Sequence, residues 1–204
     1  MDKQRNNTEH KISDNQTNES TLEEILLAAD ILSRLPEGKS LNRILFTEIA
    51  RLVTSPIIEF VPLKIIDNKI NVLLIPRDAD DPLWPSMLHT PGTAVRPLDN
   101  NIEEPFKRLL NGELGDVDLS SLNYAGMQLH HTDRGNELAH IFYGEVDGVS
   151  SGTYYPVDAL PNNIIASQLS MIKAVVGEYA TSKNIPIPEL SYPKASIIKL
   201  SPSI

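Results

Sequence analysis

The sequence contains no cysteine, few basic residues and no long apolar run. Without cysteine the chain can form no disulfide bond, thiolate nucleophile or cysteine-ligated zinc site. Its 18 Lys and Arg against 27 Asp and Glu give a formal net charge of −9, which argues against nonspecific nucleic-acid binding. No apolar stretch reaches the ~18–20 residues that a membrane-spanning helix needs. These absences favour a cytoplasmic protein without membrane association.

Both ends of the chain differ in composition from its middle. Residues 1–19 are polar and hold only Met1 and Ile12 as aliphatic residues, which predicts a disordered tail and no signal peptide. Residues 184–204 contain several prolines, and we expect them to form a loop or a docked C-terminal tail. The folded part is therefore expected between residues 20 and 183.

Two amphipathic helices are predicted before the main domain. Ser20-x-x-Glu23 has the pattern of a capping box, and the helix that it begins is broken by Pro36-Glu37-Gly38. A second helix is predicted over residues 41–53. Together they predict an N-terminal α-hairpin over residues 20–54. Its apolar faces are expected to pack on the main domain or on a second subunit, as a homodimer.

Residues 55–183 alternate between strand and helix patterns. The apolar runs 57–66 and 70–75 flank the turn signal Asp67-Asn68-Lys69. Two more strands are predicted at 122–130 and 137–146, and the clearest helical stripe of the chain covers 162–181. This order predicts an α+β domain with a mixed sheet between helices.

One segment of this domain resembles a known catalytic box. Residues 83–116 read LWPSMLHTPGTAVRPLDNNIEEPFKRLLNGELGD, in which Trp84 and the Pro91-Gly92 turn precede a short strand and a charged helix. The layout resembles that of the Nudix superfamily, whose box reads G-x5-E-x7-R-E-U-x-E-E-x-G-U with U an aliphatic residue. Residues 155–161 also resemble the family segment that precedes its last helix. The resemblance implies a Nudix-like αβα sandwich.

The box is degenerate at the positions that carry its chemistry. Anchoring the register at Arg108 places Leu109 and Gly112 at two of the three clustered metal acids, and only Glu113 at the third. Asn111-Gly112 predicts a helix C-cap that ends the helix before Glu113. Pro105 is expected to limit the other end and to exclude Glu104 from helical geometry. The predicted helix is thus about two turns long.

The resemblance also implies candidate site residues. Family members bind Mg²⁺ or Mn²⁺ through the box acids. An active protein would therefore use Glu113, at a box position, with the relocated acid Glu104 as metal ligands. Glu113 and Glu145 are then the catalytic candidates. The candidate ligand-binding residues are Arg77, Trp84, Arg96 and Arg108.

The role of Arg108 stays open between a contact to a ligand phosphate and a surface salt bridge with Glu104. The substitutions favour a domain that binds a nucleoside-diphosphate-type small molecule or a partner, with weak or no hydrolysis. The alternative is an active Mg²⁺- or Mn²⁺-dependent pyrophosphohydrolase that uses Glu113 with relocated acids.

Overall fold

A computed structural model describes residues 20–35 and 41–190, which divide into two compact units between Glu37 and Gly38. The predictions for residues 1–19, for the helix break at 36–38 and for most of the C-terminal tail lie outside the described residues or at their edge. The division places the two predicted helices in different units. The α-hairpin over residues 20–54 therefore stays a prediction.

Helix α1 (Leu22–Ser33) forms the described part of the first unit. The Thr21 hydroxyl accepts a hydrogen bond from the Glu24 amide, and the Glu24 carboxylate accepts one from the Thr21 amide, at 3.2 and 2.8 Å. The capping box is thus one residue later than predicted, because the helix begins at Leu22 and Thr21 holds the N-cap position.

The second unit is built on one mixed sheet with the order β3-β2-β1-β6-β5. The long strand β1 (Thr54–Ile66) pairs antiparallel with β2 (Lys69–Pro76) and parallel with β6 (Gly135–Asp147). Asp67 and Asn68 have φ of 50° and 61°, as a two-residue hairpin turn requires. Strand β5 (Asp118–Thr132) pairs with β6. Strand β2 also pairs with the two-residue strand β3 (Leu88–His89) and with β7 (Thr153–Pro156). The short strand β4 (Gly92–Ala94) pairs with β1.

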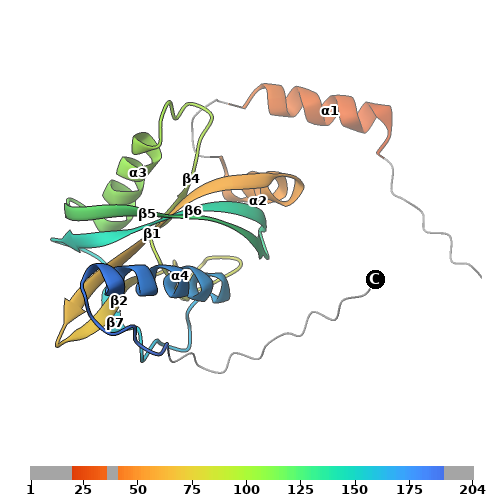
Figure 1. Cartoon of the computed structure of the whole chain (residues 1–204). Helices are drawn as coiled ribbons and strands as arrows, with labels where there is room; N and C mark the ends of the chain where they lie inside the picture. Colours follow the sequence, from red (N-terminus) through yellow and green to blue (C-terminus); the bar gives the residue numbers. More distant parts are fainter. Residues whose placement is uncertain (1–19, 36–40, 191–204) are drawn as a thin grey trace, which may run out of the picture. The chain divides into compact units, whose positions relative to one another are not determined.

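Helices cover both faces of the sheet (Figure 1). Helix α4 (Ala166–Ser182) lies along one face, where its side chains form a core with alternate residues of the strands, such as Ile57 and Val61. Helix α3 (Glu103–Leu109) and the π-helix η1 (Leu110–Leu114) pack on the other face, against Ile58 and Phe60. Because successive residues of a strand point to opposite faces, β1 contributes to both cores. The prediction of an α+β sandwich is confirmed.

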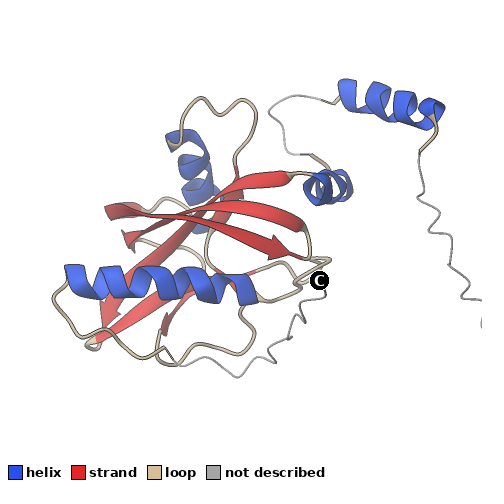
Figure 2. Ribbon diagram, turned by 45° about the vertical axis from the view of Figure 1, so that its right-hand side comes forward, coloured by secondary structure: helices blue, strands red, loops and turns tan. Residues whose placement is uncertain are grey.

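Helix α2 (Arg43–Leu52) belongs to this second unit, contacts β1 and β6, and buries Ala50 (Figure 2). A backbone contact fixes this position: a Cβ placed on Gly135 at the start of β6 would lie 2.2 Å from the Ala50 carbonyl oxygen. The second amphipathic helix therefore packs on the main domain.

The last helix begins four residues later than predicted. The Asn163 carbonyl accepts a hydrogen bond from the Leu88 amide, and the Ile165 amide donates one to the Leu88 carbonyl. Residues 163–165 therefore pair with β3, and the helix starts only at Ala166.

Within the described residues, no helix is long and apolar enough to cross a membrane.

Candidate functional site

Glu113 lies in a continuous helical segment, contrary to the sequence prediction. Asn111 and Gly112 do not end the helix, because the backbone passes from α3 directly into the π-turn of η1. The segment ends instead at Gly115, whose φ of 87° favours glycine and whose amide donates to the Leu110 carbonyl at 3.0 Å. The prediction of a C-cap before Glu113 was therefore wrong.

The N-terminal end of this segment also differs from the prediction. Glu103 and Glu104, the two residues directly before Pro105, are both helical. The Asn101 side chain accepts hydrogen bonds from both of their amides, at 3.0 and 3.2 Å. Pro105 then lies in the first turn of the helix. Backbone amides there have no hydrogen-bond acceptor within the helix, so the absence of an amide hydrogen in proline costs no helical hydrogen bond. Proline thus tolerates the preceding helical residues here.

Two serines of the β6–β7 loop hold the π-turn in place. The Ser150 hydroxyl and amide both donate to the Leu114 carbonyl, at 2.8 and 3.1 Å, and the Ser151 hydroxyl donates to the Glu113 carbonyl at 2.5 Å. Carbonyls that a π-turn leaves without regular helical partners are satisfied in this way. The loop therefore fixes the backbone from which the Glu113 side chain projects.

The Glu113 carboxylate contacts the start of β4. Its Oε2 atom accepts a 3.0 Å hydrogen bond from the Gly92 amide. Burial raises the pKa of Glu113 to about 7, although the Gly92 hydrogen bond and the charge of Arg77 act in the opposite direction. Near neutral pH this side chain is poised between its acid and carboxylate forms.

A second glutamate, Glu59, also lies close to Gly92. It is 7% exposed in the middle of β1, directly opposite Gly92 in the β1–β4 pairing. A Cβ placed on Gly92 would lie 2.8 Å from Glu59 Oε2, so this close approach requires glycine. Glu59 Oε2 lies 3.1 Å from the Thr90 hydroxyl, which also contacts the Gln168 side chain. Burial raises the pKa of Glu59 to about 8.

These two glutamates face a pocket of about 580 Å³. Strands β1 and β4, helix α2, the start of α4 and the loop after β2 all contribute to its walls. It combines apolar side chains with charged and aromatic ones. The polar and aromatic residues among those that line it include Glu59, Arg77, Trp84, His89, Arg96, Glu113, Arg134, Glu137 and Gln168.

Trp84 is flanked by two arginines at this pocket. The Arg77 and Arg134 Cζ atoms each lie 5.6 Å from the centroid of the indole ring. Arg77 forms an ion pair with the buried Asp81 at 2.6 Å, and Asp81 also accepts hydrogen bonds from the Trp84 and Leu83 amides. Burial raises the pKa of Asp81, but these hydrogen bonds outweigh it and lower the pKa to about 2. The loop after β2 is thereby held in one conformation.

Two further buried groups complete the polar wall. Glu137 is 5% exposed and forms an ion pair with Arg134. His89 is 8% exposed, and burial lowers its pKa to about 4, with the charge of Arg77 acting in the same direction. His89 is therefore neutral at neutral pH.

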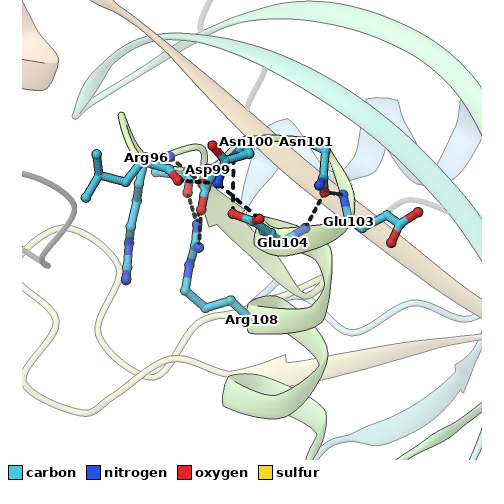
Figure 3. A network of polar contacts seen from close by, with 9 residues as sticks. Arg96, Asp99, Asn100, Asn101, Glu103, Glu104 and Arg108 are labelled. Carbon is cyan, nitrogen blue, oxygen red and sulfur yellow. Dashed lines mark hydrogen bonds and ion pairs between the residues drawn. The ribbon is translucent and has the colours of Figure 1, made fainter.

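Arg108 binds the loop before its own helix. Its guanidinium forms a bidentate ion pair with Asp99, at 2.7 and 2.9 Å, and donates to the Ala94 carbonyl at 2.9 Å (Figure 3). The predicted alternative of a salt bridge between Arg108 and Glu104 is therefore wrong, because the Arg108 guanidinium pairs with Asp99. The Glu104 carboxylate instead accepts hydrogen bonds from the Asn100 amide and side chain, at 3.1 and 3.3 Å.

Arg96 belongs to the same loop and also lines the pocket. Its amide donates to Asp99 at 2.6 Å. The Arg108 hydrogen bonds are the main reason why the pKa of Asp99 lies below its usual range. The Asp99–Arg108 pair therefore positions the loop that brings Arg96 to the pocket.

Glu145 lies elsewhere, at the end of β6 beside α4. It accepts a 2.9 Å hydrogen bond from the Tyr179 hydroxyl and forms an ion pair with Lys183. The hydrogen bond from Lys183 is the main cause that lowers the pKa of Glu145. The Glu145 carboxylate thus joins β6 to α4 and to Lys183, directly after α4.

The predicted acids do not converge as a divalent cation requires. Hard cations such as Mg²⁺ need several oxygen ligands in one shell. Glu113 lies at Gly92, Glu104 at Asn100 and Glu145 at Lys183. Across residues 20–35 and 41–190, no three His, Asp or Glu side chains form a group that could hold a metal ion. The described residues do not fit the implied metal site.

Glu113, Arg77, Trp84 and Arg96, which the sequence named as candidates, line this pocket. Nothing in the sequence indicated Glu59 or its neighbours Thr90 and Gln168. Glu59 stands alone in the apolar run IIEFVPL, and a single charge in a buried strand has no spacing that identifies a partner. Thr90 and Gln168 are 31 and 109 positions away along the chain. Only the pairing of β1 with β4 and the packing of α4 bring them together.

Comparison with known proteins defines the fold. No protein-family model and no curated protein matches the sequence. Among solved structures, the Nudix domain of Shewanella oneidensis NrtR complexed with ADP ribose matches 74% of this chain and 97% of that domain, with TM-score 0.51 and 15% identity. NrtR complexed with a 27mer DNA has TM-score 0.50 and 16% identity over 62% of each chain.

A MutT Nudix hydrolase from Burkholderia pseudomallei gives a similar result, with TM-score 0.50 and 17% identity over 60% of this chain and 98% of that one. The chain spans less than two thirds of the NrtR in the DNA complex. At this level of identity the likeness is one of architecture. The chain has a Nudix-like fold, as the resemblance of its box implied.

Proposed function

We propose that the chain binds a nucleoside-diphosphate-type ligand in the pocket beside Gly92, with weak or no hydrolysis. The observation that carries the proposal is the convergence of Arg77, Arg96 and Arg134 with Trp84 on one pocket of about 580 Å³. Guanidinium groups bind phosphate oxygens in a fixed bidentate geometry. An indole ring offers a stacking surface, and the volume lies within the usual ~300–1,000 Å³ range of small-molecule sites.

The carboxyl groups that line the same pocket suit the sugar part of such a ligand. Glu113 and Glu59 present carboxyl oxygens near Gly92, where they can accept hydrogen bonds from hydroxyl groups. The ADP ribose complex of the NrtR Nudix domain, which shares this fold, supports the choice of ligand class. We therefore select ADP-ribose as the first probe.

Isothermal titration calorimetry with ADP-ribose tests the proposal. We expect saturable binding that weakens at least about tenfold in Arg77→Ala, because a phosphate contact is lost. Lys107→Ala is the matched control, since Lys107 also forms an i,i+4 ion pair but is 71% exposed on α3. Absence of saturable binding to ADP-ribose, nucleotide-sugars and NADH would overturn the proposal.

Hydrolysis is the second candidate, because the π-turn presents Glu113 at the pocket in place of ending the helix before it. The separation of Glu104 and Glu145 from Glu113 favours binding without turnover. The deciding assay incubates the protein with the same compounds and Mg²⁺ or Mn²⁺, then measures phosphate released after phosphatase treatment. Turnover that disappears in Glu113→Gln would establish the hydrolase and overturn binding alone.

Two proposals concern partners. The net charge of −9 leads us to expect no nonspecific DNA binding, although NrtR was crystallised with a 27mer DNA. A gel-shift assay with unrelated duplex DNA at low salt tests this.

We also propose a homodimer through residues 20–54. Removing residues 1–37, up to the boundary between the two units, should lower the solution mass to that of a monomer if α1 holds the dimer together.

A further inference from the structure

Glu59 is a buried carboxyl group in an apolar strand. Its neighbours along β1, Ile58 and Phe60, are 0% exposed, and Glu59 itself is 7% exposed. Among the described residues, no Lys, Arg or His forms an ion pair with it. An ionised carboxylate buried without a cation carries a large desolvation cost. The protein must therefore stabilise this side chain in another way.

The hydrogen bonds around Thr90 show how. The Thr90 amide donates to Gln168 Oε1 at 3.1 Å, which fixes the orientation of the Gln168 amide with its oxygen toward Thr90. The Thr90 hydroxyl forms its shorter contact with this same oxygen. Because Gln168 Oε1 is only an acceptor, the single hydroxyl hydrogen of Thr90 points to it.

This assignment leaves the Thr90 oxygen facing Glu59 Oε2 at 3.1 Å without a hydrogen between them. Two lone-pair oxygens at that distance repel, unless one of them carries a proton. A proton on Glu59 Oε2 completes the chain, in which Glu59 donates to Thr90 and Thr90 donates to Gln168. Glu59 Oε2, the Thr90 hydroxyl and Gln168 Oε1 are then each joined by a hydrogen bond.

We infer that Glu59 is a neutral carboxylic acid in the folded protein and acts as a specificity-determining residue, which admits an anionic ligand beside Gly92 only while it keeps its proton. This inference rests on the proposed function for its ligand. The charged neighbours are Glu113 from η1 and Glu137 from β6, of which Glu137 is paired with Arg134. Thr90 and Gln168 are neutral. Ionised Glu59 would add a further negative charge to this wall and repel a diphosphate.

Burial raises the pKa of Glu59 to about 8. The charges of Glu137 and Glu113 act in the same direction, and hydrogen bonding with the Thr90 and Gln168 side chains acts against them. The selection for an anion should therefore hold at neutral pH and fail in mildly alkaline solution.

Glu59→Gln provides the test, because glutamine keeps the shape and a donor toward Thr90 but cannot ionise. Without ligand, the melting temperature of the wild type should fall more between about pH 5 and about pH 9 than that of Glu59→Gln. A raised pKa in the folded state stabilises the protein below the unfolded pKa, and this stability is lost as the pH rises through about 8. The infrared spectrum of the wild type minus that of Glu59→Gln should show a protonated-carboxyl band at neutral pH, because Glu113 contributes equally to both proteins and cancels.

With ADP-ribose, we expect wild-type affinity to fall about tenfold between about pH 7 and about pH 9, and that of Glu59→Gln to change less than about threefold. Glu145→Gln, away from the pocket, should follow the wild type. Equal pH dependence of unfolding in wild type and Glu59→Gln, with no difference in the carboxyl band, overturns the neutral acid. Failure of both proteins to bind ADP-ribose, nucleotide-sugars or NADH overturns the proposed function and the selecting role, while the ligand-free measurements still decide the protonation state.

Discussion

The Gly92 amide donates a 3.0 Å hydrogen bond to the Glu113 carboxylate, and so joins β4 to the π-turn that follows α3. The contact ties together the two glycine-containing segments of the degenerate box, the turn before the short strand and the end of the helix. It also places a half-buried carboxyl group at the pocket, and the protonation of that group is linked to folding.

Glu113→Gln should change how stability depends on pH. Burial raises the pKa of Glu113 from 4.5 to about 7, so the folded state holds a proton that the unfolded state releases. This contribution is complete below about pH 4.5 and is lost as the pH rises through 7, on the order of 3 kcal/mol in total. Urea denaturation at about pH 5 and about pH 8 should show a smaller loss in Glu113→Gln than in wild type. Glu48→Gln, 60% exposed on α2, should leave the wild-type difference unchanged.

The position of Glu113 also shows where sequence reasoning reached its limit. The sheet and the α4 core follow from apolar periodicity, since Ile57 and Val61 alternate with Ile58 and Phe60 along β1. Asn111-Gly112 has the composition of a C-cap, yet the Ser150 and Ser151 hydroxyls satisfy the carbonyls of a π-turn there. Those serines come from a loop about 38 positions later, so no local pattern could predict the result.

Gly92→Ala should destabilise the protein by about 1–3 kcal/mol, because the new methyl group would lie 2.8 Å from Glu59 Oε2 and force the buried side chain to move. Gly177→Ala is the matched control in the interior of α4, where a Cβ has no neighbour within 4 Å; it should stabilise by about 0.5–1 kcal/mol. Chemical denaturation measures both.

A double-mutant cycle identifies the cause of the loss at Gly92. If the collision with Glu59 is responsible, Gly92→Ala should cost less in a Glu59→Ala background than in wild type. Equal costs in the two backgrounds would assign the loss to the backbone of β4.

Asp99→Asn should lower the free energy of unfolding by about 1–3 kcal/mol at neutral pH. The Asp99 side chain is 7% exposed, and its loss of charge leaves the Arg108 guanidinium largely buried without its anion. The Nε atom of Arg108 already has no hydrogen-bond partner among the described residues. Glu103→Gln breaks the exposed pair with Lys107 on the same helix and should cost less than about 0.5 kcal/mol. Similar costs for the two variants would contradict a supporting role for the Asp99–Arg108 pair.

Glu145→Gln should separate stability from ligand binding. Its carboxylate joins the end of β6 to α4 through the Tyr179 hydroxyl and Lys183, and none of these groups lines the pocket. We expect a loss of about 1 kcal/mol at neutral pH. The pKa of Glu145 is lowered, mainly by the Lys183 hydrogen bond, so its contribution is present above the unfolded pKa and is lost as the pH falls; the cost of the variant should shrink in acid. ADP-ribose affinity, measured where the variant is fully folded, should equal that of wild type. A variant that folds but loses ADP-ribose binding would return Glu145 to the site.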